Sequence, residues 1–344
     1  MIKRRKNYVT VYIVTIYIII FSVFAGYRIF FLETIDANEK TGLYIPSNPS
    51  LDQVVDSLLS AKIIKSPEKF LKHISLSKYS SFKGGYYAVP KNITYRNLVK
   101  MLCFGQQSPV NIVISGTVRT KNRLAGILAK QIEADSVSLL NALNDSLFLK
   151  ELDFTPNNSI LLFMPNTYNV YWNREVKQLF KDMKKEYDKY WTSDRCDKLK
   201  LSGLTKVEAM ILASIIMEES SKYDELPGIA GVYINRLHKG MPLQADPTVK
   251  YAVNDFSLRR VLIAHTKFDS PYNTYIYKGL PPGPICIPER RAVDAVLNYE
   301  KHDYLYFCAK DDFSGYHVFA KTLQQHNQNA SAYRNALNRR KIFQ

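Results

Sequence analysis

An uncharged run from Tyr8 to Tyr27 follows a cluster of basic residues at the start of the chain. A helix of about 20 such residues spans the hydrocarbon core of a bilayer. Ile29–Leu32 continue the apolar pattern beyond Arg28, whose long side chain can reach back to the interface. We therefore predict a tail at residues 1–7 and a single-pass membrane anchor at residues 8–32. Because the basic cluster precedes the anchor, the N-terminus is expected in the cytoplasm and the remainder outside it.

A cleaved signal peptide is the competing interpretation of the same segment. Val23-Phe24-Ala25 is similar to a small-residue cleavage site. The apolar run is longer than the roughly 7–15 residues of a usual signal-peptide core, so the pattern favours an uncleaved anchor. The sequence offers no second span, and the rest of the chain is therefore predicted to form one extracytoplasmic body.

After a polar stretch at residues 33–42, predicted to be a linker, one pattern of apolar and polar positions occurs twice. Each copy has a short apolar segment ended by proline, a Ser or Thr, and then apolar residues at helical spacing. The copies are Ile45-Pro46 with Leu51, Val54, Val55 and Leu58, and Val89-Pro90 with Tyr95, Leu98, Val99 and Leu102. Each copy predicts a strand followed by an amphipathic helix, and Ser50 with Gln53 matches a capping box in the first. Two copies are too few for a solenoid, so we predict a small α+β module at residues 43–134.

Residues 135–344 are predicted to form a mixed α+β domain, which makes the whole chain α+β. Thr205 and Glu208 match a capping box, and Val207, Ile211, Leu212, Ile215 and Ile216 give the following helix one buried stripe. The segment at 240–290, rich in Pro, Gly, Asn and Tyr, predicts a long functional loop. The remaining predicted elements are a strand at Val110–Ile114, a strand or buried turn at Ile160–Pro165, helices at 119–133, 135–151, 174–190, 205–220 and 226–238 and from Thr322, and a hairpin at Tyr304–Ala309 and Tyr316–Phe319.

Charge and composition narrow the choice of partners. Lys and Arg total 47 against 31 Asp and Glu, an excess that suits nucleic acid, a membrane surface or an acidic polymer as well as a solvated basic surface. The sequence has no RNP-like, zinc-finger or P-loop pattern, which disfavours nucleic acid. Its 4 cysteines form no C-x-x-C pair, and its 6 histidines have no metal-ligand spacing. We therefore expect no metal and no cofactor.

Glu219 is the first candidate for chemistry. Its neighbours one turn and two turns earlier, Ile215, Ile216 and Leu212, share its apolar helix face. Desolvation raises the pKa of a carboxyl group, and an acid still protonated near neutral pH can protonate a leaving oxygen. The other interpretation is a carboxylate that is exposed or paired with a basic side chain at the helix end. Glu218 points about 100° away on the helix, which predicts a more exposed position near Ser214.

The long loop supplies candidates for binding. Met241–Thr248 holds Gln244 and Asp246, and Ser270–Tyr275 interleaves aromatic rings with amides and hydroxyls. Such a mixture suits a carbohydrate, although an ordinary Tyr-rich packed loop has the same composition. The candidates from the loop are Gln244, Asp246, Tyr272, Asn273, Thr274 and Tyr275. His317, in the predicted hairpin, either contacts substrate or has a structural role.

Several segments together resemble the YceG-like family of endolytic transglycosylases. They are Leu212–Ser220, Ile229–Leu237, Gly240–Val249, Ser270–Tyr275, Gly279–Ile285 and Gly315–Phe319, with Gly105–Val110 and Pro165–Tyr168 upstream. The resemblance covers nearly the whole chain after the anchor. It implies a LysM-like module at residues 43–134 and a catalytic domain at residues 135–344. It places the family's catalytic Glu at Glu219, and Asn235 joins the candidate substrate-binding residues from a matching segment.

The family resemblance also implies a reaction. The expected activity is non-hydrolytic cleavage between N-acetylmuramic acid and N-acetylglucosamine in nascent peptidoglycan strands, which leaves 1,6-anhydro ends. Peptidoglycan strands and the lipid bilayer are the expected partners, peptidoglycan synthases are implied by the family only, and the expected location is the bacterial inner membrane. Met217 and Ser220 depart from the common Glu and Thr of the family, and Ile287–Glu289 replaces a common Asn-Pro-Gly. Neither departure removes the acid.

Two other functions stay open from the sequence. A hydrolytic muramidase would use a second carboxylate, for which Asp246 is the candidate. A membrane-anchored peptidoglycan-binding scaffold would rely on the repeated strand–helix module and would not cleave its ligand. The concentration of specific motifs between residues 212 and 319 favours the enzyme.

Overall fold

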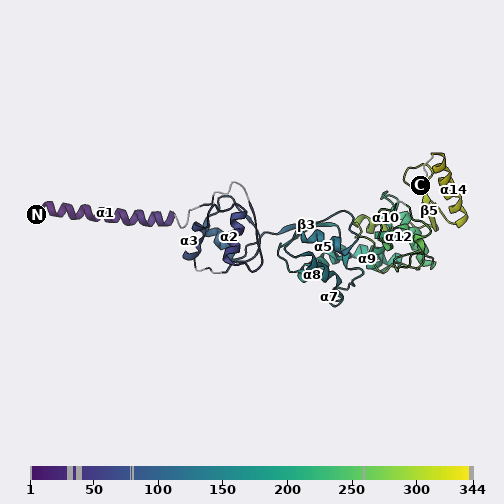
Figure 1. Ribbon diagram of the computed structural model, residues 1–344, viewed down its shortest axis with the longest axis horizontal. Helices are drawn as coiled ribbons and strands as arrows, with labels where there is room; N and C mark the ends of the chain where they lie inside the picture. The colour runs from purple at the N-terminus through teal and green to yellow at the C-terminus, as the bar shows by residue number, and fades with distance from the viewer. Residues whose placement is uncertain are drawn as a thin grey trace. The chain divides into compact units, whose positions relative to one another are not determined.

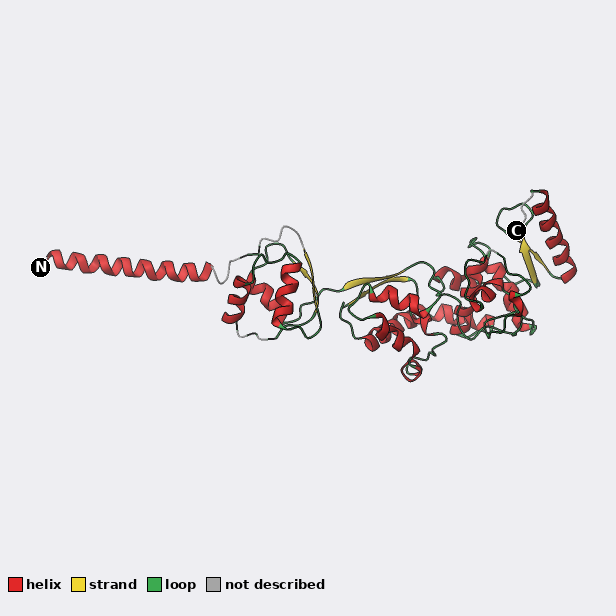
Figure 2. Ribbon diagram, viewed as in Figure 1, coloured by secondary structure: helices red, strands yellow, loops and turns green. Residues whose placement is uncertain are grey.

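The structure is a computed structural model that describes residues 2–28, 34–35, 41–77, 79, 81–258 and 260–340. The predicted α+β class is confirmed, because helices dominate and the strands form three two-stranded sheets within the described residues (Figure 2). The chain divides into two compact units. Unit 1 holds Met1–Asn111 with residues 131–133 and 169–174, and unit 2 holds the rest. Since the chain passes between the units several times, the boundary after residue 134 stays a prediction.

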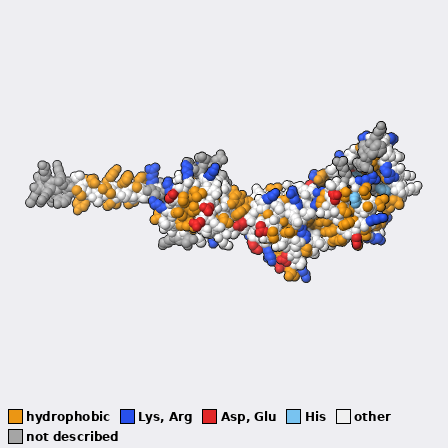
Figure 3. Space-filling model, viewed as in Figure 1, with side chains coloured by type: hydrophobic (Ala, Val, Ile, Leu, Met, Phe, Trp, Pro, Cys, Tyr) orange, Lys and Arg blue, Asp and Glu red, His pale blue; other side chains and the backbone are white. Residues whose placement is uncertain are grey.

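The apolar run at the N-terminus forms helix α1, Ile2–Tyr27. Its window from Thr10 to Tyr27 has a mean hydropathy of 2.0 and none of it is buried, and Figure 3 shows apolar side chains along it. Within the described residues it is the one helix long and apolar enough to cross a membrane. The end of the predicted anchor, residues 29–32, lies outside the described residues.

The predicted linker at 33–42 is also described only in part. Ile35 is not a free linker residue, because its side chain is buried and its N–H donates to Ile93 O at 2.8 Å. Its neighbour Thr34 forms an antiparallel bridge with Thr94. The large apolar side chain of Ile35 therefore packs into the core of unit 1.

Unit 1 contains the repeated strand–helix pattern. Strands β1 (Thr41–Ile45) and β2 (Gly85–Val89) pair antiparallel, with Tyr44 opposite Tyr86. Helices α2 (Leu51–Ser60) and α4 (Tyr95–Cys103) begin at the predicted residues, capped by the side chains of Ser50 and Thr94. The predicted capping box with Gln53 is confirmed. Helix α3 (Glu68–Leu76), which the sequence did not predict, has no side-chain cap to mark its start.

The predicted strand β3 (Val110–Ile114) is confirmed, and its partner is β4 (Asn166–Val170), which the sequence did not predict. For the apolar segment before β4, Ile160–Pro165, the sequence predicted either a strand or a buried turn, and the structure has the buried turn. It forms the short 3₁₀ helix η2 (Ser159–Leu162). All of its residues are buried, so its apolar composition reflects packing and not a strand.

Unit 2 is mainly helical. The helix predicted at 135–151 is divided at Asp145, whose side chain accepts from Phe148 N and starts a new helix. Helices α9 and α13 were missed, and the predicted loop at 240–290 includes helix α12. The elements of unit 2 are α5 Lys121–Ala129, α6 Ser136–Asn144, α7 Ser146–Lys150, α8 Val176–Tyr190, α9 Ser193–Ser202, α10 Lys206–Glu219, α11 Leu226–His238, α12 Asp246–Ala252, η3 His265–Lys267, α13 Arg290–Leu297, β5 Tyr306–Ala309, β6 His317–Ala320 and α14 Leu323–Arg339.

Helix α10 is the centre of unit 2 and starts at the predicted capping box. The single buried stripe predicted for it is wrong, because every residue from Ala209 to Ile216 is buried. Helices α9, α11, α12 and α13 all contact it, and Figure 1 shows α9 and α12 beside it. Ser214 lies inside this packing, where its Oγ donates to Ile211 O at 2.7 Å and accepts from Ile285 N at 3.1 Å.

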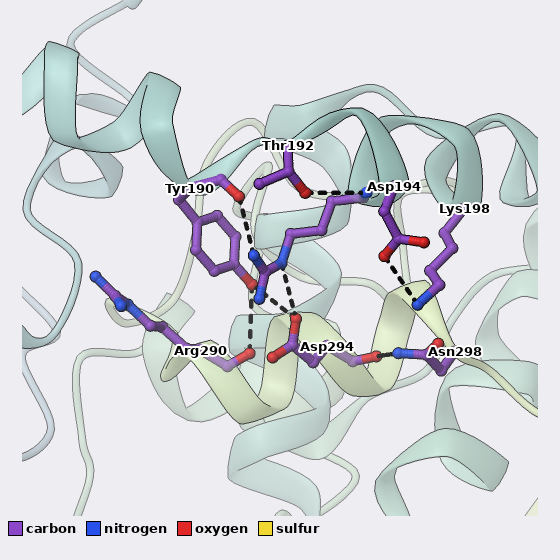
Figure 4. Close-up of polar contacts among 8 residues, drawn as sticks. Tyr190, Thr192, Asp194, Lys198, Arg290, Asp294 and Asn298 are labelled. Atoms are coloured by element: carbon purple, nitrogen blue, oxygen red, sulfur yellow. Dashed lines mark hydrogen bonds and ion pairs between the residues drawn. The ribbon is translucent and has the colours of Figure 1, made fainter.

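A polar cluster joins α8, α9 and α13 beside this core (Figure 4). The Tyr190 hydroxyl donates to Asp294 Oδ1 at 3.1 Å, and Arg195 Nε donates to the same oxygen at 3.2 Å. The Arg195 guanidinium also lies 4.2 Å from the centre of the Tyr190 ring. These contacts attach the end of α8 and the start of α9 to α13, one of the helices that packs on α10.

Replacing Ser214 with alanine tests this packing. The Ser214→Ala variant leaves the buried Ile285 N–H without its acceptor, which costs about 1–3 kcal/mol. We expect the free energy of unfolding, measured by urea denaturation of the full chain in detergent, to fall by that amount. Exposed Ser136 is the matched control, and Ser136→Ala is expected to change it by less than about 0.5 kcal/mol. Equal effects of the two substitutions would contradict the role of Ser214.

Candidate active site

Glu219 is the last residue of α10, and its half-buried carboxyl group lines a pocket of about 330 Å³. The helix ends there because Ser220 adopts an extended backbone with φ of −139°. From the next helix, α11, the Tyr233 hydroxyl donates a hydrogen bond of 2.6 Å to Glu219 Oε1. The buried core helix therefore delivers one carboxyl group to the edge of a cavity.

The surroundings of Glu219 raise its pKa to about 7. Desolvation by burial is the largest cause, and the nearby charge of Asp246 acts in the same direction. The hydrogen bond from Tyr233 and the charges of Lys250 and Arg236 lower the pKa in part. Near neutral pH the group is consequently present in both its protonated and its ionised forms, as a general acid and base requires.

Segments that are distant in sequence form the pocket walls. They are the end of α10, helix α11, the loops on both sides of α12, and the β5–β6 hairpin with the start of α14. The lining residues are Glu219, Tyr233, Arg236, Leu243, Gln244, Asp246, Tyr275, Tyr306, Phe307, Cys308, Ala309, His317, Leu323 and His326. The lining combines aromatic rings with hydrogen-bonding groups, a mixture that suits a sugar.

Arg236 connects these walls. Its Nε donates to Leu305 O at 2.6 Å, and its Nη1 donates to Leu243 O at 2.6 Å. The side chain is buried, and this burial lowers its pKa from the usual value. One guanidinium thus holds the loop and the hairpin together and supplies positive charge beside Glu219.

Three predicted residues of the loop reach the pocket. Gln244 has a left-handed backbone with φ of 52°, uncommon for a residue with a side chain, and its exposed side chain lines the cavity. Asp246 accepts a hydrogen bond of 2.6 Å from the Tyr275 hydroxyl. Gln244 N donates to Thr274 O at 3.0 Å, which holds the strained residue in place.

Asn273 and Thr274 are buried and do not line the pocket. Asn273 Nδ2 donates to Thr266 O and Phe268 O at 3.0 and 2.8 Å. The Thr274 hydroxyl accepts from Ala245 N at 3.0 Å. Both residues therefore form part of the loop framework around Gln244 and Asp246, and their predicted contact with substrate stays a prediction.

Asn235 and Tyr272 also lie away from the pocket lining. Asn235 Nδ2 donates to His302 O at 2.7 Å and to Tyr304 O at 3.0 Å, so it attaches α11 to the segment before β5. The Tyr272 ring packs on Tyr251 with 4.7 Å between their centres. The hydrogen bonds of Asn235 and the ring contact of Tyr272 thus join parts of the fold to one another.

His317 lines the pocket, and its Nδ1 lies 3.0 Å from Oε2 of Glu225, a residue that the sequence did not single out. Tyr233, Arg236 and the hairpin aromatics were also missed. Tyr233 and Arg236 are three residues apart on a helix and share one face, so two polar groups on a mostly apolar helix were the available signal. The hairpin residues gave no local signal, because only the tertiary fold brings them to Glu219.

Glu218 has a different environment from its neighbour. Its carboxylate accepts from Arg119 Nη2 at 2.8 and 3.1 Å, within a second pocket of about 210 Å³. The side chain is 20% exposed, and the Arg119 guanidinium lies 4.7 Å from the centre of the Phe256 ring. Adjacent carboxyl groups are thus separated into an ion pair and a protonatable acid.

Within the described ranges, no group of three or more His, Cys, Asp or Glu side chains is placed to hold a metal ion. A half-buried carboxyl group of raised pKa, in a cavity walled by aromatic and polar side chains, is typical of an enzyme active site.

The chain belongs to the YceG-like family, whose family model matches residues 43–332. It is 30% identical over 319 residues to an endolytic murein transglycosylase of Bacillus subtilis, covering 88% of both chains. An endolytic murein transglycosylase of Streptococcus pneumoniae is 28% identical, and the match covers 89% of this chain and 61% of the relative. The crystal structure of a YceG-like protein of Listeria monocytogenes superposes with a TM-score of 0.53 and 27% identity, over 85% of this chain and 99% of that one. The predicted family and the predicted enzyme class, the lytic transglycosylases, are confirmed.

Removing the Tyr233 hydroxyl tests the electrostatics of Glu219. The hydrogen bond from Tyr233 favours the ionised carboxylate, so Tyr233→Phe is expected to raise the pKa of Glu219 above about 7. An infrared titration of the carboxyl C=O band, assigned with Glu219→Gln, measures the shift. Exposed Tyr277 provides the control, and Tyr277→Phe should leave that titration in place. A lower pKa in Tyr233→Phe would contradict the assigned direction.

Proposed function

We propose that this chain is an endolytic murein transglycosylase that cleaves between N-acetylmuramic acid and N-acetylglucosamine in peptidoglycan strands without consuming water. The observation that carries the proposal is the carboxyl group of Glu219, whose pKa is raised to about 7, inside a cavity able to hold a sugar. The names of the relatives support the reaction class.

In the first step, protonated Glu219 donates its proton to the glycosidic oxygen and the bond to the muramic acid C1 breaks. The raised pKa supports this role, because a fully ionised carboxylate has no proton to give. The substrate's own acetamido group or nearby carbonyl and amide groups stabilise the oxocarbenium-like centre. As the pH rises through about 7, the protonated fraction of Glu219 falls and this step slows.

In the second step, ionised Glu219 takes the proton from the C6 hydroxyl of the muramic acid. The hydroxyl oxygen then closes on C1 and gives the 1,6-anhydro end. The Tyr233 hydroxyl, 2.6 Å from Oε1, stabilises the carboxylate that exists between the two steps. One residue thereby serves as acid and then as base, and neither water nor cofactor takes part.

The other pocket residues position the sugar in this mechanism. Gln244 presents an exposed amide, Tyr275 and Asp246 form one hydrogen-bonded pair, and His317 presents its ring from the hairpin. Asp246 also raises the pKa of Glu219, so it tunes the acid as well as binding. Orientation of this kind supplies a large part of catalysis.

A hydrolytic muramidase is the second candidate, because Asp246 shares the cavity with Glu219 and is a second carboxylate. In that reaction one carboxyl group protonates the leaving oxygen, and the other activates water or acts as nucleophile. The two reactions differ in their products, since hydrolysis leaves a reducing end.

Mass spectrometry of the glycan ends formed from peptidoglycan strands tests the proposal. The full chain in detergent is expected to give ends one water lighter than reducing ends. Glu219→Gln is expected to slow their formation by about 10²–10⁴-fold, since it removes the acid and base. Glu218→Gln is the matched control and should stay within a few-fold of the unaltered chain, because Glu218 is paired with Arg119 outside this pocket.

Each alternative has its own outcome. Reducing ends in place of anhydro ends would establish the muramidase. Binding of strands without any cleavage would establish the scaffold. Near-normal cleavage by Glu219→Gln would remove Glu219 from the catalytic role.

We also propose that α1 anchors the chain in the bacterial inner membrane, with the N-terminus in the cytoplasm and both units outside. The apolar window Thr10–Tyr27 and the basic residues before it support this orientation. Peptidoglycan synthases are proposed as partners on the family resemblance alone, and copurification of a synthase with the full chain would test that partnership.

Protease protection tests the orientation. In spheroplasts, protease added outside is expected to digest the chain after about residue 33, because that part lies beyond the membrane. A tag at the N-terminus is expected to stay protected until the membrane is opened with detergent. Digestion of the tag in intact spheroplasts would contradict the proposed orientation.

A further inference from the structure

Glu225 is a buried carboxylate that the proposed mechanism does not use. It directly precedes α11 and is 9% exposed. A buried charge is costly unless hydrogen bonds compensate it, so its partners indicate its purpose. All of the hydrogen bonds that the structure gives its side chain come from two segments beside the candidate active site.

One segment is the β5–β6 hairpin. The backbone N–H of His317 donates to Glu225 Oε1 at 2.6 Å, and His317 Nδ1 lies 3.0 Å from Glu225 Oε2. The Phe307 and His317 rings also pack nearly perpendicular to each other, at 88°, with 5.3 Å between the ring centres. The imidazole is consequently held on two sides.

The other segment is the end of α10. The Ser220 hydroxyl donates to Glu225 Oε2 at 3.2 Å, and Ser220 directly follows Glu219. The same hydroxyl accepts from Lys222 N at 3.0 Å. One carboxylate thus connects the residue after the proposed acid with a histidine that lines the same pocket.

The chemistry of the carboxylate determines the tautomer of the histidine. An ionised carboxylate only accepts hydrogen bonds, so the Nδ1 that faces Glu225 must carry the hydrogen. In the neutral ring, the remaining nitrogen, Nε2, then has a free lone pair. Because His317 lines the pocket and its Nδ1 edge is engaged with Glu225, Nε2 is the ring nitrogen available to a ligand there.

We infer that Glu225 is a positioning residue that holds His317 as the Nδ1–H tautomer, so that His317 Nε2 accepts a hydrogen bond from a hydroxyl or amide N–H of the sugar bound beside Glu219. This assignment rests on the proposed function for the identity of the ligand. The tautomer itself follows from the contacts of Glu225 alone.

Replacing Glu225 with glutamine tests the inference because it keeps the shape and reverses the hydrogen bond. The glutamine oxygen can still accept from His317 N, and its NH₂ group then faces Nδ1. That arrangement forces the ring hydrogen onto Nε2, which changes the group facing the sugar from acceptor to donor.

Nitrogen-15 NMR of the full chain with labelled histidine, at alkaline pH, reads the tautomer directly. The His317 signals are assigned by their loss in His317→Gln. We expect a protonated Nδ1 and an unprotonated Nε2 in the unaltered chain, and the reverse in Glu225→Gln. A structural role alone would not exchange the two nitrogens.

Kinetics of strand cleavage provide the second measurement. Glu225→Gln is expected to raise KM about tenfold and to leave kcat within about twofold, because an interaction present in both ground and transition states is lost. Glu151→Gln, at an exposed position in the same unit, should change neither constant. An unchanged KM together with a reversed tautomer would overturn the role of His317 in binding.

The outcomes separate this inference from the proposed function. A hydrogen on Nε2 in the unaltered chain overturns the inference, whether or not Glu225→Gln folds and whether or not strands are cleaved. Absence of cleavage by the unaltered chain removes the proposed function, while the NMR result still decides the tautomer.

Discussion

Burial of α10 on every side is the constraint on which the rest of the site depends. A helix surrounded by α9, α11, α12 and α13 cannot slide or turn without breaking the core, so the position of its last residue is determined. That residue is Glu219, and the same packing that fixes its position also shields it in part from water. Desolvation then raises the pKa to about 7, and the Tyr233 hydroxyl limits the rise while giving the ionised form a partner. Position and acidity therefore have one physical cause.

The cavity in front of Glu219 is built differently from the core behind it. Its walls come from segments that are distant in sequence and are joined by a few charge-assisted hydrogen bonds, which are stronger than bonds between neutral groups. The Arg236 guanidinium holds the loop to the hairpin, and the Glu225 carboxylate holds the hairpin to the end of α10. Both charged groups are buried and form hydrogen bonds with backbone and side-chain partners. The result is a pocket whose polar surface is oriented before any ligand enters.

The long loop shows why composition alone does not separate binding residues from framework. Asn273 and Tyr275 are two residues apart and have equally suitable side chains for a sugar. The structure turns Asn273 inward to satisfy backbone carbonyls and places Tyr275 in the cavity, bonded to Asp246. Gln244 reaches the cavity only because its backbone adopts a left-handed conformation. The direction in which each side chain points depends on the turns of the loop. Hydrogen bonds between distant parts of the loop determine the positions of those turns.

The sequence by itself determined those features that depend on interactions between residues close together in the chain. The apolar run of α1, the caps at Ser50, Thr94 and Thr205, and the helix that ends at Glu219 follow from residues within a few positions of one another. The identity of Glu219 as the candidate acid followed from the same periodicity and from the family motifs. Only the tertiary structure decided the partners of that acid. Tyr233, Arg236, Glu225 and the hairpin rings come from other elements, and no spacing along the chain encodes their approach. The raised pKa of Glu219 comes from burial and from Asp246, Tyr233 and Arg236 on other elements, so it is a property of the folded unit.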